Sequence, residues 1–208
     1  VKTVEHLLAA LAGLQIDNIL IEIDGEEVPI LDGSSKFFVE ALLKAGIQTQ
    51  SKEREYIEVK EVIKFEKPEK GIELIITPAD SFLMNVEVDY NSEVLAPQSA
   101  TINSIDYFLK EISNSRTFVF LHEIQFLIEH NLVRGGDLDN AIVFVEKMPD
   151  TSVIERLAKF FNNPNIQVME EGILNNVQLH HDNESARHKL LDLVGDLYLL
   201  GKPIKGHI

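Results

Sequence analysis

Hydrophobic side chains in the first part of the chain recur at helical spacing. An apolar stripe with i, i+3, i+4, i+7 periodicity comprises Val4, Leu7, Leu8, Leu11 and Leu14. This spacing predicts an amphipathic helix with Thr3 as its N-cap. A second helix is predicted to begin after Ser34 or Ser35 and to end at Gly46. Similar patterns predict further helices at 105–112, 123–129, 152–161 and 184–196.

Alternating or continuous apolar runs predict the strands. The first run covers residues 19–23 and ends at a turn formed by Asp24 and Gly25. Residues 48–55 are polar and charged, which predicts a linker. Beyond this linker the apolar runs predict strands at 56–65, 72–77, 82–90, around Ala100, at 117–120 and at 141–145.

The order of these elements indicates the fold class. Strands and helices do not alternate strictly, as they would in a doubly wound parallel sheet, so the pattern predicts an α+β protein. We expect two lobes, each a β-sheet layered with helices. Residues 1–50 would be the C-terminal part of the first lobe, and residues 51–208 would form the second lobe.

Composition narrows the classes of function. The net charge of −15 argues against nucleic-acid binding, which needs a basic surface, but leaves room for a small anionic substrate. The sequence has no cysteine, which excludes disulfides, thiolate zinc ligands and a cysteine nucleophile, and fits a reducing cytosol. No signal peptide is visible, and no apolar run approaches the roughly 20 residues needed to span a bilayer. We therefore expect a cytoplasmic protein that does not span the membrane.

The helix predicted at 184–196 carries the strongest chemical signal. His188 and Asp192 are four residues apart, so they lie on one face of the helix and can bind the same metal ion. Asp196 extends this face by one turn. The alternative is an exposed polar pair of a kind common on helices. Gly195 costs about 1 kcal/mol relative to alanine inside a helix, so its presence suggests close approach by backbone or ligand.

A second signal lies at the other end of the chain. Glu5 and His6 are adjacent in the first predicted helix, and they extend the His188–Asp192 pair to two histidines, an aspartate and a spare glutamate. That set suits a hydrolytic zinc site with one coordination position left for water. The alternative is that Glu5 is a favourable first-turn acid and His6 a partly buried helical histidine.

Other candidate motifs are weaker. His180 and His181 are adjacent in the loop before the last helix, and we favour a structural role for them. Gly135 and Gly136 are not followed by a Gly-Lys-Ser/Thr sequence, so we interpret them as a turn before a strand rather than as a phosphate loop. No Gly-x-Ser-x-Gly sequence supports Ser-His-Asp chemistry.

Five segments in the same order resemble the UDP-3-O-acyl-N-acetylglucosamine deacetylases, the enzymes of the committed step of lipid A synthesis in Gram-negative bacteria. The segments are 3–13 with 16–18, 28–34, 115–120, 135–141 and 187–197. The resemblance extends over the whole chain and implies a lipid-metabolism hydrolase with two α+β lobes and its active site between them.

The resemblance also implies roles for individual residues. It assigns Zn²⁺ to His6, His188 and Asp192, and the same ligands suit Fe²⁺. Glu5 would be the general base that activates water, and Thr117 would donate its hydroxyl to the oxyanion.

The resemblance also implies residues that contact the substrate and an acid that orients a catalytic histidine. Lys189 and Phe118 match positions that contact the nucleotide sugar, and Asp196 matches an acid that orients a catalytic histidine. The passage for the acyl chain would be lined by Ile124, Leu127 and Leu138, although aliphatic residues there fit core packing equally well.

The chain departs from the family pattern at both ends. It begins inside what is normally the fourth or fifth element, so we expect the family's first strands to be missing. It also stops before the family's catalytic Gly-His segment, because His207 aligns with the preceding strand. Some family members continue into a fused acyl-carrier-protein dehydratase, and such a domain is compatible with this sequence.

The sequence thus predicts a zinc-dependent amide hydrolase that removes acetate from UDP-3-O-acyl-N-acetylglucosamine. The main alternative is an inactive truncated fragment that binds zinc or a sugar nucleotide without turnover, which the missing histidine favours. A metallohydrolase with a different amide substrate is a weaker alternative, because it does not account for the implied acyl passage.

Overall fold

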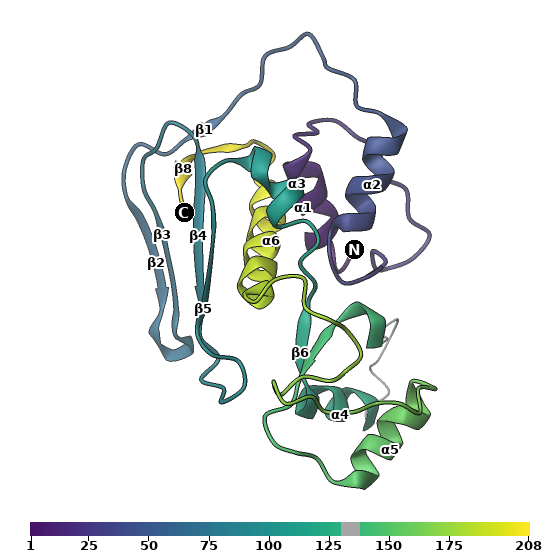
Figure 1. Cartoon of the computed structure of the whole chain (residues 1–208). Helices are drawn as coiled ribbons and strands as arrows, with labels where there is room; N and C mark the ends of the chain where they lie inside the picture. Colours follow the sequence, from purple (N-terminus) through teal and green to yellow (C-terminus); the bar gives the residue numbers. More distant parts are fainter. Residues whose placement is uncertain (130–137) are drawn as a thin grey trace.

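Two helices from opposite ends of the chain pack side by side at the centre of the structure (Figure 1). They are α1 (Glu5–Gly13) and α6 (Glu184–Tyr198). Gly195 permits this contact, because a Cβ atom there would lie 2.1 Å from the carbonyl oxygen of Glu5. The close approach by backbone that the sequence suggested at this glycine is therefore confirmed.

The computed structural model describes residues 1–129 and 138–208, except for the side chains of Gln125, Leu127 and Glu129. The predicted turn at Gly135 and Gly136 lies outside the described residues. The described chain mixes helices and strands, which confirms the α+β class. Its other helical segments are α2 (Lys36–Ala45), η1 (Pro68–Lys70), η2 (Ile105–Tyr107), α3 (Phe108–Glu111), α4 (Leu121–Glu129), η3 (Leu138–Asn140) and α5 (Thr151–Phe160). None of the helices described is long and apolar enough to cross a membrane.

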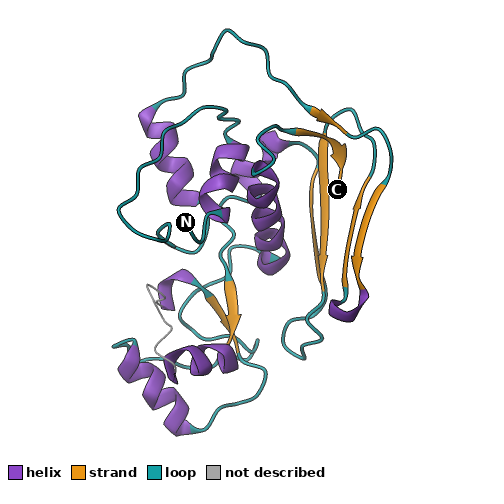
Figure 2. Ribbon diagram, turned by 180° about the vertical axis from the view of Figure 1, so that it is seen from behind, coloured by secondary structure: helices purple, strands orange, loops and turns teal. Residues whose placement is uncertain are grey.

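Strands in the described chain form three separate sheets. The largest has the order β1-β8-β4-β5, in which β8 is parallel to both neighbours and β5 is antiparallel to β4. Its members are β1 (Ile57–Glu58), β8 (Ile204–His207), β4 (Phe82–Val88) and β5 (Gln98–Ile102). The other two are the antiparallel hairpin of β2 (Ile63–Lys67) and β3 (Ile72–Ile76), and the parallel pair of β6 (Phe118–Phe120) and β7 (Ile142–Phe144). Seen from behind, the central helices lie on one side of β4 and β5 and the hairpin on the other (Figure 2).

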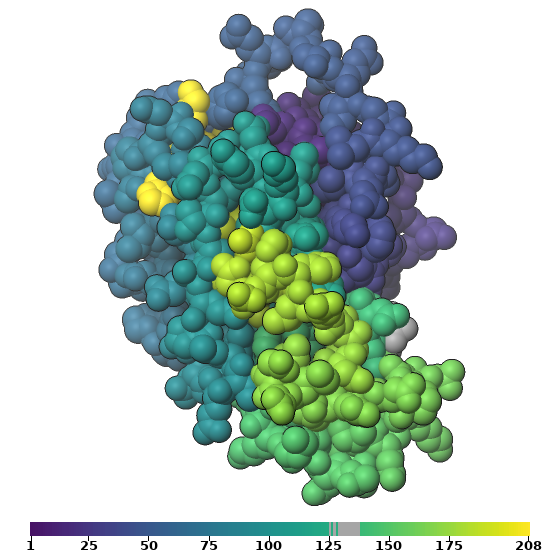
Figure 3. Space-filling model, in the orientation of Figure 1, coloured from purple at the N-terminus to yellow at the C-terminus, as the bar shows by residue number. Residues whose placement is uncertain are grey.

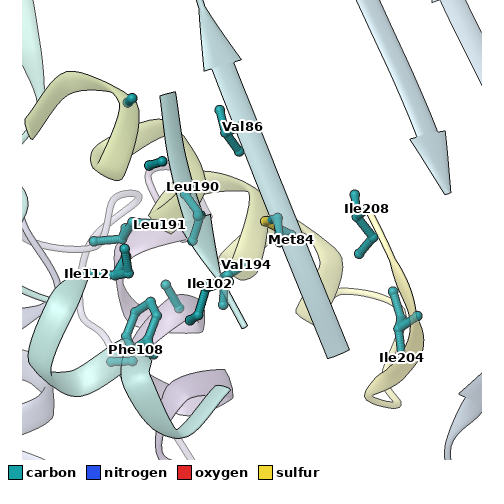
Figure 4. Packing of buried hydrophobic residues seen from close by; sticks show 14 of the residues in the cluster. Met84, Val86, Ile102, Phe108, Ile112, Leu190, Leu191, Val194, Ile204 and Ile208 are labelled. Atoms are coloured by element: carbon teal, nitrogen blue, oxygen red, sulfur yellow. The ribbon is translucent and has the colours of Figure 1, made fainter. Parts of the chain in front are cut away.

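The main core lies between the four-stranded sheet and the central helices. Side chains alternate along β4, so Met84 and Val86 are buried while Asn85 and Glu87 are exposed. In Figure 4, Leu190 and Val194 of α6 lie beside this strand. Complete burial of a leucine of this kind stabilises the fold by about 1.5–3 kcal/mol. The core thereby fixes the face of α6 that turns toward the sheet.

A second apolar region surrounds β6 and β7. Alternation along β7 places Val143 in one cluster and Ile142 with Phe144 in another, so the pair of strands is covered on both faces. Helices α4 and α5 contribute to the first of these clusters through Ile124 and Leu157. The segment that precedes α6 passes over the junction between this region and the central helices (yellow-green in Figure 3).

Most predicted helices are confirmed, but two sequence predictions near the N-terminus are wrong. Residues 19–23 form no strand, because a strand requires a hydrogen-bonding neighbour and the described chain offers none; Leu20 is 83% exposed. Thr3 is not the N-cap of α1, which begins after Val4 without a side-chain cap. The bridge between Lys2 and Glu27 holds Thr3 at φ 53°, and its hydroxyl donates to the Glu27 carboxylate instead.

Candidate metal centre

The central helix pair brings together the candidate ligands from the two ends of the sequence. His6 lies in the first turn of α1, while His188 and Asp192 lie on α6. Each contributes one ligand-type atom, and the three atoms lie within 4.8 Å of one another. Within the described part of the chain, this is the one group of three such residues with that spacing.

Distances in this group suit a divalent metal ion. Oδ1 of Asp192 lies 3.3 Å from Nε2 of His188 and 3.7 Å from Nε2 of His6. Ligands about 2 Å from a tetrahedral zinc ion are separated from each other by roughly 3.3 Å. The same Oδ1 is buried and has no hydrogen-bond partner among the described residues. A buried acceptor of this kind is costly unless something satisfies it, so the donor set fits a bound cation.

The orientation of the His188 ring follows from one hydrogen bond. Its Nδ1 lies 3.0 Å from the carbonyl oxygen of Ser115. A carbonyl oxygen can only accept, so Nδ1 carries the proton and Nε2 presents a lone pair to Asp192 and His6. The second histidine is held differently, because Nδ1 of His6 is buried without a hydrogen-bond partner among the described residues.

Burial keeps both histidines in the form that binds metals. It lowers the pKa of His188 to about 4, although the charge of Asp192 opposes this shift. Burial also lowers the pKa of His6, again against the charge of Asp192. Both rings are therefore neutral near pH 7, and their contacts with Asp192 are not ion pairs at that pH. Neutral imidazole with a carboxylate is the set that zinc or ferrous iron binds.

Two further carboxyl groups, those of Glu5 and Asp196, interact electrostatically with the candidate ligands. Glu5 precedes His6, and Asp196 follows Asp192 by one turn of α6. Partial burial raises the pKa of Asp196, and the charges of Asp192 and Glu5 raise it further. Glu5 therefore acts on His6, and Asp192 and Glu5 act on Asp196, which concentrates negative charge where a cation would be bound.

Lys189 connects the metal centre to an aromatic surface. Its Nζ donates to Oδ2 of Asp192 at 2.9 Å and lies 5.5 Å from the centre of the Phe118 ring. Burial alone would lower the pKa of Lys189, but the charge and hydrogen bond of Asp192 outweigh it and raise the pKa. Tyr90 meets Phe118 edge to face at 5.2 Å. A cation and two aromatic rings therefore lie at the edge of the site.

A short loop fastens Thr117 near the central helices. The backbone N–H of Thr117 donates to the carbonyl of Gly33 at 2.8 Å. Gly33 has φ 79°, and a Cβ atom there would lie 2.0 Å from the carbonyl oxygen of Asn140, so only glycine fits. The hydroxyl of Ser35 donates to the carbonyl of His6 at 2.7 Å. The segment at 33–35 therefore joins the start of β6 to the first turn of α1.

Two of the predicted acyl-chain residues are buried in the apolar cluster around β7. Ile124 and Leu138 are 7% and 3% exposed and pack in the cluster that also contains Val143 and Leu157. The side chain of Leu127 lies outside the described residues.

Three histidines outside the ligand group have other partners. His180 donates from Nδ1 to the carbonyl of Asn114 at 2.9 Å, and His181 lies 3.3 Å from the side-chain oxygen of the same asparagine. His207 lies in β8, as the sequence predicted, and its Nε2 lies 2.7 Å from Oδ1 of Asn85. The structure therefore gives all three histidines structural contacts.

The sequence prediction missed two side chains and one backbone carbonyl that contribute to the site. The charge of Asp32 acts on His6, and Tyr90 forms part of the aromatic surface. Asp32 lies in the 28–34 segment, but it precedes the turn glycine Gly33, and aspartate is common in turns for structural reasons. Tyr90 follows a predicted strand, and nothing in its spacing indicates Phe118 as a neighbour. The carbonyl of Ser115 could not be found from residue types at all, because every residue has one.

A separate cavity of about 370 Å³ lies near the other end of α6. It is lined in part by Val194, Leu197 and Tyr198, and none of the three candidate ligands borders it. Its polar groups are largely paired with one another; for example, Nε of Arg54 donates to Asp17 at 2.9 Å. This cavity and the candidate metal ligands are thus in different places, and the chemistry belongs to the ligands.

A buried cluster of two histidines and one aspartate, with carboxylates beside it, is typical of metal-dependent hydrolases. The family model described as "LpxC: UDP-3-O-acyl N-acetylglycosamine deacetylase" matches residues 1–159 and 155–208. The chain therefore belongs to this family.

Relatives of known name agree with the family. The chain is 46% identical over 211 residues to a protein of Chlorobaculum tepidum named "Bifunctional enzyme LpxC/FabZ", and the match covers 100% of this chain and 45% of that protein. It is 43% identical over 208 residues to the protein of the same name from Bacteroides thetaiotaomicron, with the same shares covered. It is 41% identical over 212 residues to the "UDP-3-O-acyl-N-acetylglucosamine deacetylase" of Idiomarina loihiensis, covering 100% of this chain and 60% of the relative. The chain thus spans about half the length of the curated relatives it matches.

Proposed function

We propose that the chain is part of a zinc-dependent amide hydrolase that removes acetate from UDP-3-O-acyl-N-acetylglucosamine in lipid A synthesis. The observation that carries this proposal is the convergence of His6, His188 and Asp192 around an unsatisfied buried carboxylate oxygen. Membership of the deacetylase family supplies the substrate and the reaction. We further propose a cytoplasmic location, near the membrane face where lipid A is built.

His6, His188 and Asp192 would hold the metal. A bound Zn²⁺ or Fe²⁺ would lower the pKa of water and polarise the amide carbonyl. Glu5 would accept a proton at its carboxylate as water attacks, because it stands next to a ligand and close to the charges of the site. Thr117 would donate its hydroxyl to the developing oxyanion, which stabilises charge that appears only in the transition state.

Substrate binding would use the edge of the site. Lys189 offers a cation to the diphosphate, and Phe118 offers an aromatic face beside it. This local cation explains how a chain with net charge −15 could bind a dianionic nucleotide sugar. Asp196 would hold and orient a protonated histidine, because the nearby charges of Asp192 and Glu5 favour a cation beside its carboxyl group.

Other roles implied by the resemblance remain proposals. Ile124, Leu127 and Leu138 would line the acyl-chain passage, and the apolar cluster around Ile124 and Leu138 supports this placement. Division of the chain into lobes at 1–50 and 51–208 is likewise a prediction. Relatives named as bifunctional LpxC/FabZ enzymes support our proposal that a dehydratase domain is fused to the protein.

Zinc binding and acetate release test the proposed function. We expect the chain to bind about one zinc ion, and we expect His188→Ala to abolish this binding. His122→Ala is the matched control, because the side chain of His122 is 65% exposed and lies outside the ligand group. Acetate release from the UDP-acyl-sugar would then be measured with zinc-loaded protein.

Each outcome separates the proposed function from its alternative. Release of acetate that depends on His188 and Glu5 supports the deacetylase. Zinc binding without acetate release, also after extension of the chain to the length of its relatives, would favour binding without turnover. Equal zinc content in wild type and His188→Ala would overturn the ligand assignment.

A further inference from the structure

A buried ion pair lies one helical turn from the metal centre, and the proposed reaction does not use it. Arg116 and Glu184 are 7% and 1% exposed. Nε of Arg116 donates to Oε1 of Glu184 at 2.9 Å, and Nη2 donates to Oε2 at 3.1 Å. A buried ion pair of this kind is often no more stabilising than apolar residues would be, so stability alone does not explain its presence.

The Glu184 carboxylate also binds backbone groups of two other segments. Its Oε1 accepts from the N–H of Arg116 at 3.0 Å, and its Oε2 accepts from the N–H of His180 at 2.7 Å. With the two bonds from the guanidinium, the carboxylate accepts four hydrogen bonds. Arg116 adds a bond from Nη2 to the carbonyl of Gln178 at 2.6 Å. This pair therefore ties the loop before α6 and the segment before β6 to the first turn of α6.

One peptide unit links this ion pair to the metal ligand. The carbonyl of Ser115, which accepts from His188, and the N–H of Arg116, which donates to Glu184, belong to the same peptide bond. The bond is trans and planar, so its C=O and N–H point in opposite directions. Glu184 and His188 are four residues apart on α6, a rise of roughly 6 Å. The two side chains thus hold the two ends of a single peptide plane.

We propose that Arg116 and Glu184 are positioning residues that orient the His188 imidazole through the Ser115–Arg116 peptide plane. Fixing the N–H end of the plane fixes the direction of its carbonyl. That carbonyl selects the tautomer of His188 and directs its Nε2 lone pair toward Asp192 and His6. The inference rests on the proposed metal site, but it concerns groups that do not touch the metal.

Neighbouring residues extend the same fastening along the segment. The carbonyl of Asn114 accepts from His180, and the N–H of Thr117 donates to Gly33. Each of residues 114–117, just before β6, is therefore held by a hydrogen bond to a residue in another segment. Because Thr117 follows Arg116 directly, the ion pair also limits where the proposed oxyanion donor can lie.

Glu184→Gln and Arg116→Lys test the inference. Glu184→Gln replaces one acceptor oxygen with an amide N–H donor that faces other donors. Arg116→Lys keeps the positive charge but loses the bidentate contact with Glu184. We expect either change to weaken zinc affinity about 10-fold or more, since loss of an outer partner typically costs 10–100-fold. Affinity would be measured by chelator competition, and ligand geometry by the absorption spectrum of the Co²⁺-loaded chain.

Two controls separate positioning from general loss of stability. Leu157→Ala removes a side chain buried in the cluster around β7, away from the ligands, and we expect it to destabilise the fold while leaving the zinc affinity of folded protein unchanged. Glu111→Gln removes an exposed carboxylate that pairs with Arg187 of α6 at 3.1 Å, and we expect no change in zinc affinity. Zinc affinity within about twofold of wild type in both Arg116→Lys and Glu184→Gln would overturn the inference.

A second readout keeps the inference independent of metal binding. Nitrogen-15 NMR of the metal-free chain reports which imidazole nitrogen of His188 carries the proton. We expect the Nδ1–H form in wild type and in both controls, and a mixture of tautomers in the Arg116 and Glu184 variants. If wild type binds no zinc, the proposed function fails, whereas an unchanged tautomer in the variants overturns the positioning role by itself. Arg116→Lys, the milder change, serves if Glu184→Gln does not fold.

Discussion

The two halves of α6 handle polar groups in opposite ways. Its N-terminal half, taken as residues 184–192, buries Glu184, Ser185 and His188, and Oδ1 of Asp192 has no hydrogen-bond partner among the described residues. Its C-terminal half buries apolar Val194 against the sheet and borders a cavity whose polar groups are paired near the surface. Both halves pack against the first turn of α1, through Asp192 beside His6 and through Gly195 beside Glu5, whereas the ion pair of Arg54 and Asp17 at the cavity is exposed to solvent.

This difference between the halves of α6 indicates which polar groups serve function rather than stability. Buried polar groups that lack partners, or need several, cost free energy and persist where another component completes them. Exposed ion pairs contribute little in either direction. We therefore expect substitutions in the N-terminal half to change metal binding strongly and those around the cavity to change very little.

Gly195→Ala is expected to have the largest effect, because it acts on the contact that joins both halves to α1. Its Cβ would lie 2.1 Å from the carbonyl of Glu5, a backbone atom that cannot move aside cheaply. We expect a loss of about 3 kcal/mol in the free energy of unfolding, measured with urea, and loss of zinc binding as His6 moves away from α6. Gly25→Ala is the control, because its Cβ would meet nothing closer than 3.9 Å. Equal effects of the two changes would contradict this role of the glycine.

Asp192→Asn would sharpen the contrast between function and stability. The amide can replace the unsatisfied oxygen with a donor 3.3 Å from Nε2 of His188, while its carbonyl still accepts from Lys189. We expect zinc affinity to fall by more than about 100-fold, because a ligand is lost outright. We also expect metal-free protein to become more stable by about 1 kcal/mol. Reduced stability of the metal-free variant in urea would show that Asp192 is satisfied without a cation.

Glu184 predicts how stability depends on pH. Burial alone would raise the pKa of its carboxyl group, but the hydrogen bonds from Arg116 outweigh burial, so the folded pKa lies below the ordinary 4.5. The folded protein thus binds this proton less tightly than the unfolded chain. The stabilisation is complete above about pH 4.5 and is lost as pH falls through the lowered folded pKa.

The comparison of wild type with Glu184→Gln isolates this contribution. We expect the difference in their free energies of unfolding to shrink as pH falls from about 7 to about 3.5, because only wild type loses a charge that the fold favours. Urea unfolding at several pH values measures it. A difference that stays constant, or grows toward low pH, would mean that the carboxylate is not stabilised in the folded state.

The sequence indicated the candidate metal ligands but not the groups that orient them. Spacing put His188 and Asp192 on one helical face, residue types added His6 from a segment far away in the sequence, and the resemblance implied the same three residues. Helical periodicity is local, so α1 and α6 could be predicted closely. The predicted strand at 19–23 failed because strand formation depends on a neighbour that periodicity does not reveal.

Tertiary contacts account for what the sequence could not supply. The ion pair between Arg116 and Glu184 joins residues 68 positions apart, and neither stands at a spacing that indicates the other. The carbonyl of Ser115 acts through its backbone, which is the same in every residue. Such partners become visible only when the chain is folded, whereas the ligand types and their helical spacing are written in the sequence.

Disruption of the surface pair at the cavity is expected to have the smallest effect. Arg54 contacts Asp17 at 2.9 Å, but their side chains are 20% and 47% exposed, so water screens most of the attraction. We expect Asp17→Asn to change the free energy of unfolding by no more than about 0.5 kcal/mol and to leave zinc affinity unchanged. Glu184→Gln, which alters an ion pair of similar length but 1% and 8% exposure, is the matched comparison. If the two substitutions change the free energy of unfolding and the zinc affinity equally, burial does not distinguish the halves of α6. The buried pair of Arg116 and Glu184 would then have no special role near the metal centre.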